Sequence, residues 1–395
     1  MIFMRKTIIF FAILCTLTAR ASQHYTVVVS LDGCRWDYPQ WYDTPLFDQM
    51  ASEGVESGLI PSFPSKTFPN HYTLATGLYP DHHGIIANNF YDPATGRTYK
   101  LSDPATKTDP VFYGGEPIWV TAQKNGLRTV IYYWAGCDVN IQSIRPWRYF
   151  SYEDNPRLTY DQCVNSIIDM LLLPEAERPN LIMAYFDQPD YNGHDFGPQD
   201  KHTRDAVVKM DRLMRRLYEG IRALPIGSDV NLIILSDHGM TSLADERVVN
   251  LHQVLRDEWL TSADGNVPTN LYVHPEYMDS VWNALSHVEH IQYWHKADIP
   301  TYLHYGTNPR VGDIVVLPDL GWVVCDSLNG EYGSHGFDPF FSDMHAMFRA
   351  VGPDFAHVSR PHFRNVDVYP LLCHLLGITH APCDGDLDEI KDLLK

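Results

Sequence analysis

Basic residues are scarce in this sequence. The 395 residues include 30 Lys and Arg against 49 Asp and Glu, which gives a formal charge of −19. Such a balance excludes nucleic-acid binding through a broad basic surface. A strongly acidic protein that acts on anionic phosphates would need positive charge from another source, and bound metal ions are one such source.

Cysteine is also sparse. The seven cysteines include no CxxC pair, so a zinc site made of thiolates is not expected. In an exported protein disulfides could form, and Cys373 with Cys383 is the expected pair because the two are near neighbours in the sequence. Cys34 and Cys137 lie near positions singled out below, where a free thiol would compete for a metal ion.

Beyond the first 21 residues the sequence lacks an apolar run long enough to cross a membrane. Residues 1–21 begin with a short basic stretch, continue with the apolar run TIIFFAILCTL and end in Ala19-Arg20-Ala21. This pattern is typical of a secretory signal peptide cut after Ala21. An uncleaved anchor is the alternative, but the run is shorter than the about 20 residues of a spanning helix. We therefore expect a secreted or periplasmic protein without a transmembrane segment.

Internal repeats and low-complexity tracts are absent as well, and what remains alternates between strand and helix patterns. Residues 201–222 show the apolar spacing of a helix. Residues 260–330 are rich in Tyr, Trp, His and Pro, and we expect them to form a small α+β insertion in a single catalytic domain, 22–395. Runs of β-branched and apolar residues predict buried strands at 25–33, 126–134, 180–190 and 230–239. Continuous apolar strands alternating with helices favour an α/β fold with a largely parallel sheet flanked by helices on both faces.

Acidic residues and histidines follow the ends of these predicted strands. Open α/β sheets bind ligands beyond the carboxyl ends of their strands, so the separate motifs are expected to meet. Three carboxylates and three imidazoles are typical zinc ligands. They suit two ions, each with three protein ligands and an open position, and a pair of ions about 3.5–4 Å apart suits in-line displacement at phosphorus. The six residues are Asp32, Asp190, His194, Asp237, His238 and His335.

Each of these residues is a weak signal alone. An aspartate at a strand end is usually a turn residue or a helix cap, and a single histidine is more often structural. Asp190 and His194 would share one face of a helix, but Pro189 and Gly193 favour a loop instead. Only the combination of all six predicts a metal centre.

The stretch PSFPSKTFPNHY, residues 61–72, contains a candidate nucleophile. Pro69 suits the first turn of a helix, so Thr67 is expected at a helix N-terminus, where free N–H groups favour an anion. A hydroxyl is a poor nucleophile until its proton is removed or its pKa is lowered, and coordination to a metal ion would lower it. His71 is the alternative base, but it lies one turn into the helix and is expected to face the core.

Together the motifs resemble those of a known family. Asp32, SKTFPNHYTLATGLYPDHHGI, PDYNGH, SDHGM and GSHGFD resemble the nucleotide pyrophosphatase/phosphodiesterases of the alkaline phosphatase superfamily, from about residue 25 to residue 385. The resemblance implies an alkaline-phosphatase-like sandwich and two Zn²⁺ ions. One ion would be held by Asp190, His194 and His335, and the other by Asp32, Asp237, His238 and the nucleophile Thr67. Asn88 would bind a phosphoryl oxygen beside the Thr67 N–H.

The resemblance also implies a reaction and a substrate. Nucleotide phosphodiester or pyrophosphate bonds would be hydrolysed through a phospho-threonine intermediate, with release of nucleoside 5′-monophosphates. In nucleotide-cleaving members, aromatic residues at the positions of Phe68 and Tyr152 sandwich the base, and such stacking contributes about 1–3 kcal/mol. Trp134 is expected to extend the pocket and Lys66 to attract the phosphate.

Differences from the sulfatases and the alkaline phosphatases favour the resemblance to the nucleotide pyrophosphatase/phosphodiesterases. The C/S-x-P-S/A-R signature of sulfatases is absent, and no arginine stands beside Thr67 as in alkaline phosphatases. Asp187 and Gln188 stand where relatives commonly carry Glu. Two alternatives remain open: a choline-specific phosphodiesterase, which would bind the quaternary ammonium through aromatic rings and nearby carboxylates, and a non-catalytic binding protein, which would lack ligands or the nucleophile.

Overall fold

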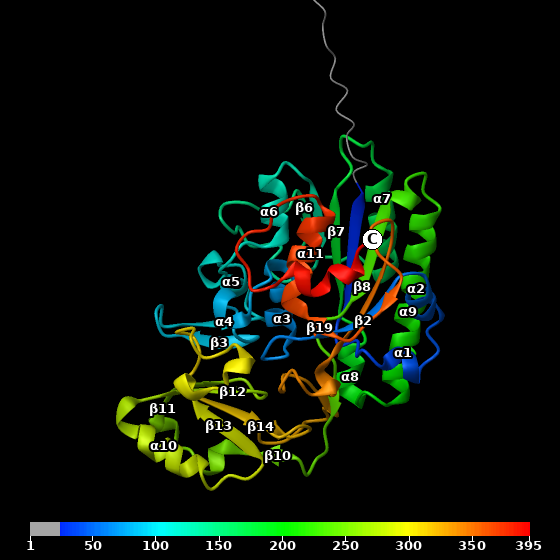
Figure 1. Ribbon diagram of the computed structural model, residues 1–395. Helices are drawn as coiled ribbons and strands as arrows, with labels where there is room; N and C mark the ends of the chain where they lie inside the picture. Colours follow the sequence, from blue (N-terminus) through cyan, green and yellow to red (C-terminus); the bar gives the residue numbers. More distant parts are fainter. Residues whose placement is uncertain (1–23) are drawn as a thin grey trace, which may run out of the picture.

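The structure, a computed structural model, describes residues 24–395 (Figure 1). The predicted signal peptide, 1–21, lies outside the described residues. A nine-stranded sheet forms the centre in the order β18-β2-β17-β8-β1-β7-β5-β6, with β19 also paired to β2. Its strands are β1 (Tyr25–Leu31), β2 (Val55–Ile60), β5 (Thr129–Tyr132), β6 (Arg148–Phe150), β7 (Leu181–Phe186), β8 (Val230–Leu235), β17 (Ala346–Val351), β18 (Val358–Ser359) and β19 (Phe363–Arg364).

The four predicted strands are the consecutive central strands β8, β1, β7 and β5. They pair in parallel, as do β5 with β6 and β2 with β18 and β19. Only β17 runs antiparallel, between β8 and β2. The predicted α/β fold with a largely parallel sheet is therefore confirmed. The predicted helix is also confirmed, since α9 spans Lys201–Arg222.

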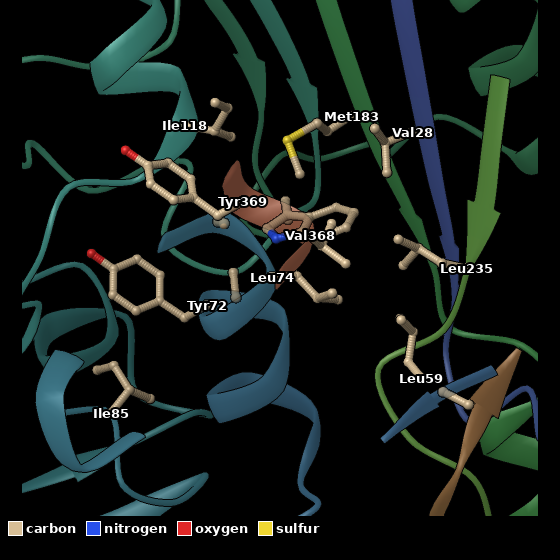
Figure 2. Packing of buried hydrophobic residues seen from close by; sticks show 14 of the residues in the cluster. Val28, Leu59, Tyr72, Leu74, Ile85, Ile118, Met183, Leu235, Val368 and Tyr369 are labelled. Carbon is tan, nitrogen blue, oxygen red and sulfur yellow. The ribbon is translucent and has the colours of Figure 1, made fainter. Parts of the chain in front are cut away.

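Helices cover both faces of the sheet because alternate strand residues point to opposite sides. On one face Val28, Met183 and Leu235 belong to a core that includes residues of α3 (Thr67–Thr76), α6 (Ile118–Lys124) and α11 (Val368–Leu375), shown in Figure 2. On the other face Val27 and Ile234 pack in a second core with residues of α2 (Pro45–Glu53), α7 (Tyr160–Leu172) and α9. Burial on both faces explains why these strands read as continuous apolar runs.

The proposed insertion, 260–330, contains a second sheet with its own core. The four antiparallel strands lie in the order β11-β12-β14-β13 and pack with α10. In Figure 1 they lie at the lower left, beside β3. The bounds are β11 (Leu260–Asp264), β12 (Thr269–Val273), α10 (Met278–Leu285), β13 (Ile291–His295) and β14 (Ile314–Pro318).

Short elements connect these layers. The helices are α1 (Tyr38–Trp41), α4 (Pro80–His83), α5 (Pro104–Lys107) and α8 (Asp190–Phe196), and the paired strands are β3 (Asn89–Asp92) with β4 (Arg97–Lys100), β9 (Thr241–Ser242) with β16 (Gly333–Ser334), and β10 (Val248–Val249) with β15 (Val323–Val324). In the described part of the chain, no helix combines the length and the apolar character needed to cross a bilayer.

The predicted disulfide between Cys373 and Cys383 is wrong. Cys373 and Cys383 are free thiols, as are the other four cysteines of residues 24–395. Cys383 instead directs its sulfur to Nδ1 of His380 and to the carbonyl oxygen of Gly385, both at 3.6 Å. Nearness in the sequence therefore did not identify a bonded pair.

Candidate active site

Backbone contacts between strand ends bring the first two aspartates together. Asp32 follows β1, and its N–H donates to the carbonyl oxygen of Phe186 at the end of β7, at 2.9 Å. The N–H of Asp190 then donates to the carbonyl oxygen of Asp32 at 3.0 Å. Gly33 has φ +64°, and a Cβ there would lie 2.8 Å from Oδ1 of Asp190. Glycine at this turn therefore permits the close approach of Asp190.

The expectation of a loop around His194 is wrong, because Asp190–Phe196 forms the short helix α8. Pro189 precedes the helix, where its missing N–H removes no helical hydrogen bond. Gly193 packs closely on Met240, whose Cε would lie 2.9 Å from a Cβ at that glycine. The helix places Asp190 and His194 on one face, with Oδ2 and Nε2 3.4 Å apart.

Asp190, His194 and His335 form the first cluster of candidate ligands. Each offers one ligand atom, and these atoms lie within 4.8 Å of one another. The Nε2 atoms of the two histidines are 3.2 Å apart. The strand end after β7 and the segment after β16 thus meet at one point.

The second cluster lies next to the first. Asp32, Asp190 and His238 also offer atoms within 4.8 Å of one another. Oδ2 of Asp237 lies 3.1 Å from Nε2 of His238. Oγ1 of Thr67 lies 3.2 Å from the same nitrogen. The structure therefore brings together all six residues singled out as ligands and the threonine singled out as nucleophile.

The three histidines are oriented in the same way. In each, Nδ1 faces a backbone carbonyl oxygen, which can only accept, so Nδ1 carries the hydrogen and Nε2 keeps its lone pair. A hydrogen bond of this kind on the far nitrogen is usual for metal-ligating histidines. The pairs are His194 with Gly333 at 2.9 Å, His238 with Gly239 at 2.8 Å and His335 with Ser65 at 2.7 Å.

The carboxylates also have the surroundings of cation ligands. Oδ1 of Asp32, Oδ1 of Asp190 and Oδ2 of Asp237 are buried without a hydrogen-bond partner. Burial and the charges of Asp237 and Asp190 raise the pKa of Asp32 well above its ordinary value. Buried charges are normally paired or bound to metal. The donor set therefore fits divalent cations.

The histidine next to the nucleophile has a different role. His71 is 1% exposed, with Nε2 2.8 Å from the Ser30 hydroxyl and Nδ1 2.9 Å from the backbone oxygen of Thr67. Burial opposes a charge on Asp237, but His238 and His71 lower its pKa well below the ordinary value. His71 is thus a buried residue whose Nδ1 lies 3.3 Å from Oδ2 of Asp237, and the Thr67 hydroxyl contacts His238 instead.

Thr67 is the first residue of α3, as its proline context predicts. The N–H of Phe68 donates to Oδ1 of Asn88 at 3.0 Å. This contact fixes the carbonyl end of the Asn88 amide, and within residues 24–395 its NH₂ end has no hydrogen bond. Asn88 is therefore held beside the helix N-terminus with two donors free.

A cavity of about 460 Å³ opens beside Thr67. Phe68, Tyr152 and Trp134, which are expected to surround the base, line this cavity, and Lys66, which is expected to attract the phosphate, does not. Trp134 is only 2% exposed, and its Nε1–H donates to the backbone oxygen of His71 at 2.8 Å, so it forms a wall. The remaining lining residues are His71, Leu101, Lys107, Tyr133, Ala135, Gly136, Cys137, Asp138, Glu153, Arg157, Tyr185 and Asp187.

Lys66 lies instead on the side of the first cluster. Its Nζ donates to Oδ1 of Asn266 at 3.4 Å. Burial lowers the pKa of Lys66 to about 8, while the carboxylates of Asp190 and Glu331 act in the opposite direction. Its stem packs on Gly336, next to His335, where a Cβ would lie 2.5 Å from Cε of Lys66, and the lysine does not line the aromatic cavity.

Sequence reasoning missed Tyr185, whose hydroxyl donates to Oδ2 of Asp32 at 2.5 Å. One signal could have found it: Tyr185 and Asp187 are two apart on a predicted strand, hence on one face, and both line the cavity. Lys107 and Arg157 also line the cavity. Nothing in their sequence context marks them.

The departures from the family pattern leave the clusters intact. Asp187 accepts a hydrogen bond from the Tyr160 hydroxyl, and Nε2 of Gln188 donates to Oδ1 of Asn192 on α8 at 2.9 Å. Burial raises the pKa of both Cys34 and Cys137 above the ordinary value. Neither thiol belongs to the two clusters of candidate ligands.

Known proteins show the same combination of fold and motifs. Residues 26–338 match the model of the type I phosphodiesterase / nucleotide pyrophosphatase family. An uncharacterised pyrophosphatase/phosphodiesterase of Schizosaccharomyces pombe is 36% identical over 386 residues, covering 92% of this chain and 79% of its own. Human ectonucleotide pyrophosphatase/phosphodiesterase family member 5 is 33% identical, covering 96% and 80%. A venom phosphodiesterase of Macrovipera lebetinus is 34% identical, covering 93% and 45%.

Solved structures of family members also match this chain. The murine family member 5, in an inactive threonine-to-alanine variant with bound AMP, superposes with a TM-score of 0.89. Its identity is 33%, and the match covers 94% of this chain and 100% of the other. The human protein gives a TM-score of 0.88 at the same identity and coverage.

Proposed function

Because this chain belongs to the type I phosphodiesterase / nucleotide pyrophosphatase family of the alkaline phosphatase superfamily, and is therefore a hydrolase of phosphoric diester or anhydride bonds, we propose that it releases nucleoside 5′-monophosphates from nucleotides. One observation carries this proposal. The Thr67 hydroxyl lies 3.2 Å from Nε2 of His238 within the carboxylate–histidine clusters, and it also lines a cavity with aromatic walls.

The proposed cofactors are two Zn²⁺ ions. Asp190, His194 and His335 would hold one, and Asp32, Asp237, His238 and Thr67 the other. The orphaned carboxylate oxygens and the common orientation of the three histidines support bound cations here, and the first set matches the cluster of Asp190, His194 and His335. When bound, zinc supplies a lowered pKa for the nucleophilic hydroxyl and positive charge for the leaving oxygen.

Thr67 is the proposed nucleophile. Its Oγ1 would form a bond to phosphorus as the bond to the leaving oxygen breaks, and the hydroxyl proton would pass to solvent. Water would then hydrolyse the phospho-threonine and regenerate the hydroxyl. The murine relative, inactive as a threonine-to-alanine variant and found with AMP, supports this role.

Asn88 and the N-terminus of α3 would stabilise the charge on phosphorus. The Asn88 amide is anchored through Oδ1 by the Phe68 N–H, so its NH₂ group is free to donate to a non-bridging oxygen. The N–H of Thr67, the first residue of the helix, would donate to the same oxygen. Preorganised donors of this type lower the barrier because they need not reorient during the reaction.

The cavity suits a nucleoside better than a choline head group. Phe68 and Tyr152 line it and would stack on the base. Three of its acidic side chains are held by protein partners, and the relatives named above are nucleotide pyrophosphatase/phosphodiesterases. The pairs are Asp138 with the Ser151 hydroxyl at 2.7 Å, Glu153 with the Lys107 ammonium, and Asp187 with the Tyr160 hydroxyl. The choline-phosphodiesterase alternative is accordingly not favoured.

We further propose an exported protein. The N-terminal pattern of basic, apolar and small residues supports it, as does the similarity to a phosphodiesterase of venom. Detection of a mature chain that begins after Ala21 would test this proposal. A mature chain that retains residues 1–21 would contradict it.

A direct assay tests the function. Zinc-loaded protein is expected to hydrolyse the nitrophenyl ester of thymidine 5′-monophosphate far faster than nitrophenyl phosphocholine. The Thr67→Ala variant is expected to lose at least about 10³-fold in kcat while it keeps its zinc, with zinc content measured by mass spectrometry. A preference for the choline ester would overturn the nucleotide assignment, and an active Thr67→Ala variant would overturn the covalent mechanism.

A further inference from the structure

Helix α9 carries a local positive charge in an acidic protein. Its 22 residues, Lys201–Arg222, include seven Lys and Arg against three Asp and Glu, whereas the whole chain has a formal charge of −19. The apolar side of the helix, with Val207, Met210 and Leu217, is buried in the second core. The basic side chains therefore lie on the outer side, where most such groups are simply solvated.

Three of these basic residues line a cleft beside α7. The helices α7 and α9 contact each other on the same face of the sheet (Figure 1). Lys209, Arg212 and Arg216 are three and four residues apart and so lie on one side of α9. They surround a cavity of about 500 Å³ together with the start of α7. The other residues that line it are Thr159, Tyr160, Asp161 and Leu213.

The cleft has more positive than negative charge. Among residues 24–395, Asp161 is the one acidic residue that lines it, and it pairs with the Arg216 guanidinium. In the same part of the chain, Arg212 has no hydrogen bond or ion pair, and Lys209 has no carboxylate partner. The Lys209 ammonium instead lies 5.6 Å from the centre of the Tyr160 ring. Two positive charges at the cleft thus lack a protein counterion.

The basic residues of α9 outside the cleft differ in this respect, because each of them has a partner within the protein. The unpaired cations of the helix are therefore those that line the cleft. The partnered residues are Lys201 and Arg204 with Asp205, Arg215 with Glu219, and Arg222 with the backbone oxygen of Gly227.

From this arrangement we propose that the cleft between α7 and α9 is a second anion site, which binds a soluble phosphoanhydride such as pyrophosphate or the phosphate chain of a nucleotide. The guanidinium fork matches phosphate oxygens, to which it can donate two parallel hydrogen bonds. Charge-assisted hydrogen bonds of this kind are the strong ones. The inference goes beyond the proposed function and does not depend on it.

The length of the cationic row favours a chain of phosphates over a single one. Lys209 and Arg216 are seven residues apart, which corresponds to about 10 Å along the helix axis. One phosphate group is too small to contact side chains over that span, whereas two or three linked phosphates can. Such a chain also carries enough negative charge to neutralise both unpaired cations.

The cleft is separate from the catalytic cavity. The residues that line the cleft do not line the cavity beside Thr67. The nearest connection is Tyr160, whose hydroxyl donates to Asp187, and Asp187 lines the catalytic cavity. A ligand in the cleft would therefore not cover Thr67, and both sites could be filled at once.

Calorimetry on zinc-loaded protein tests the site. The probe is the α,β-methylene analogue of ATP, whose bridging carbon resists hydrolysis. In Lys209→Gln/Arg212→Gln we expect one bound equivalent fewer than in wild type, because loss of two charge-assisted contacts weakens a site at least about 100-fold. Melting temperature and hydrolysis of the nitrophenyl ester of thymidine 5′-monophosphate should be unchanged.

The matched control removes the same charge from the same helix. Arg215→Gln/Arg222→Gln changes two residues that do not line the cleft and should bind as many equivalents as wild type. Equal numbers of bound equivalents in wild type and Lys209→Gln/Arg212→Gln would overturn the site. A loss in the control as large as in Lys209→Gln/Arg212→Gln would overturn it too, because it would show a diffuse effect of charge.

Chemical labelling of wild-type protein identifies the class of ligand. Lys209 is exposed, so acetic anhydride should modify it, and saturating pyrophosphate should slow this modification at least about fivefold. Thymidine, which has no phosphate, should have no effect, and Lys201 should be labelled at the same rate throughout. Protection by vesicles of phosphatidic acid and phosphatidylcholine, but not by pyrophosphate, would assign the cleft to a lipid surface and reject a soluble ligand.

The experiments also separate this site from the proposed function. Protein that hydrolyses no nucleotide but loses its bound equivalent in Lys209→Gln/Arg212→Gln would overturn the proposed function and support the second site. Protein that hydrolyses nucleotides but shows no protection of Lys209 by pyrophosphate would keep the function and overturn the second site.

Discussion

Tyr185 donates its hydroxyl to Oδ2 of Asp32 at 2.5 Å, and its ring stands edge-on to His71 with centroids 4.9 Å apart. The tyrosine also lines the aromatic cavity. One side chain thus connects the wall of the proposed nucleoside pocket with a proposed metal ligand. The hydrogen bond stabilises the charged form of Asp32, which burial and the charges of Asp237 and Asp190 oppose.

Replacement of this tyrosine should weaken the metal centre. In Tyr185→Phe the pKa of Asp32 should rise further, and because a proton and zinc compete for the same oxygens, zinc affinity should fall about 10- to 100-fold. Competition with a chromophoric chelator measures the affinity, and the loss should be larger at lower pH. Tyr133→Phe, which also lines the cavity, should retain normal zinc affinity. Equal zinc affinity in wild type and Tyr185→Phe would contradict this account.

Arg157 should act on substrate binding through Tyr152. Its guanidinium lies 4.5 Å from the centre of the Tyr152 ring, and cation–π contacts at exposed sites contribute about 0.5–1 kcal/mol. Arg157→Ala should therefore raise KM for nucleotides about two- to fivefold with little change in kcat. Bis(nitrophenyl) phosphate, which has no base, should be hydrolysed as before.

Arg148 on strand β6 is the matched control for Arg157, because it also lies over an aromatic ring. Arg148 lies 4.3 Å from the centre of the Trp147 ring, and neither residue lines the cavity. Arg148→Ala should leave both kinetic constants unchanged. A fall in kcat without a change in KM in Arg157→Ala would show that the arginine acts elsewhere.

The neighbouring histidines His82 and His83 should contribute differently to acid stability. Burial lowers the pKa of His83 to about 3, and its Nδ1 accepts from the Ile85 N–H at 3.2 Å, so it has no room for a second proton. Between its ordinary pKa and about 3, the unfolded chain binds a proton that the folded protein does not. Stability should therefore be complete above about pH 6.5 and fall as the pH drops toward 3.

Urea unfolding between pH 4 and pH 7 measures this contribution. The slope of the unfolding free energy against pH reports the number of protons taken up on unfolding. In His83→Gln this number should decrease by up to about one. His82→Gln is the control, because the His82 side chain is 50% exposed and bonded to Asp384. Equal slopes in wild type and His83→Gln would contradict the role of burial.

Removal of metal ions should both inactivate and destabilise the protein. Ions that bind only the folded state raise its stability by mass action, and without them the carboxylates of Asp32, Asp190 and Asp237 repel one another. Chelator treatment should lower the melting temperature by several degrees and abolish hydrolysis, and zinc should restore both. Full activity in protein with less than one equivalent of any metal, measured by mass spectrometry, would contradict a metal-dependent mechanism.

The centre of the fold could be predicted from the sequence because its strands are buried on both faces. Residues of β1, β5, β7 and β8 form continuous apolar runs that need no partner to be recognised. The strand β2, VESGLI, contains glycine and polar residues, and β17 contains the buried Arg349. Both escaped prediction because pairing within the sheet, rather than local preference, makes them strands.

The candidate site, like the fold, could be predicted from the sequence only in part. The six candidate ligands and Thr67 could be named from short motifs, because aspartate and histidine at strand ends have little reason to be there for packing. The helix α8 was mistaken for a loop because Gly193 is unfavourable in isolated helices, whereas here it packs on Met240. The disulfide between Cys373 and Cys383 was wrong because separation along the chain says little about the direction of side chains.

The sequence by itself determined the family, the parallel centre of the sheet and the residues that could act at phosphorus, because these depend on local patterns of residue type. Only the tertiary structure decided which groups surround them. Tyr185 reaches Asp32, Lys66 lies on the side of His335, and Asn266 of a distant hairpin meets Lys66. The hydrogen bond between Lys66 and Asn266 alone joins residues 200 positions apart. Such contacts depend on how whole elements pack, which no short stretch of sequence encodes.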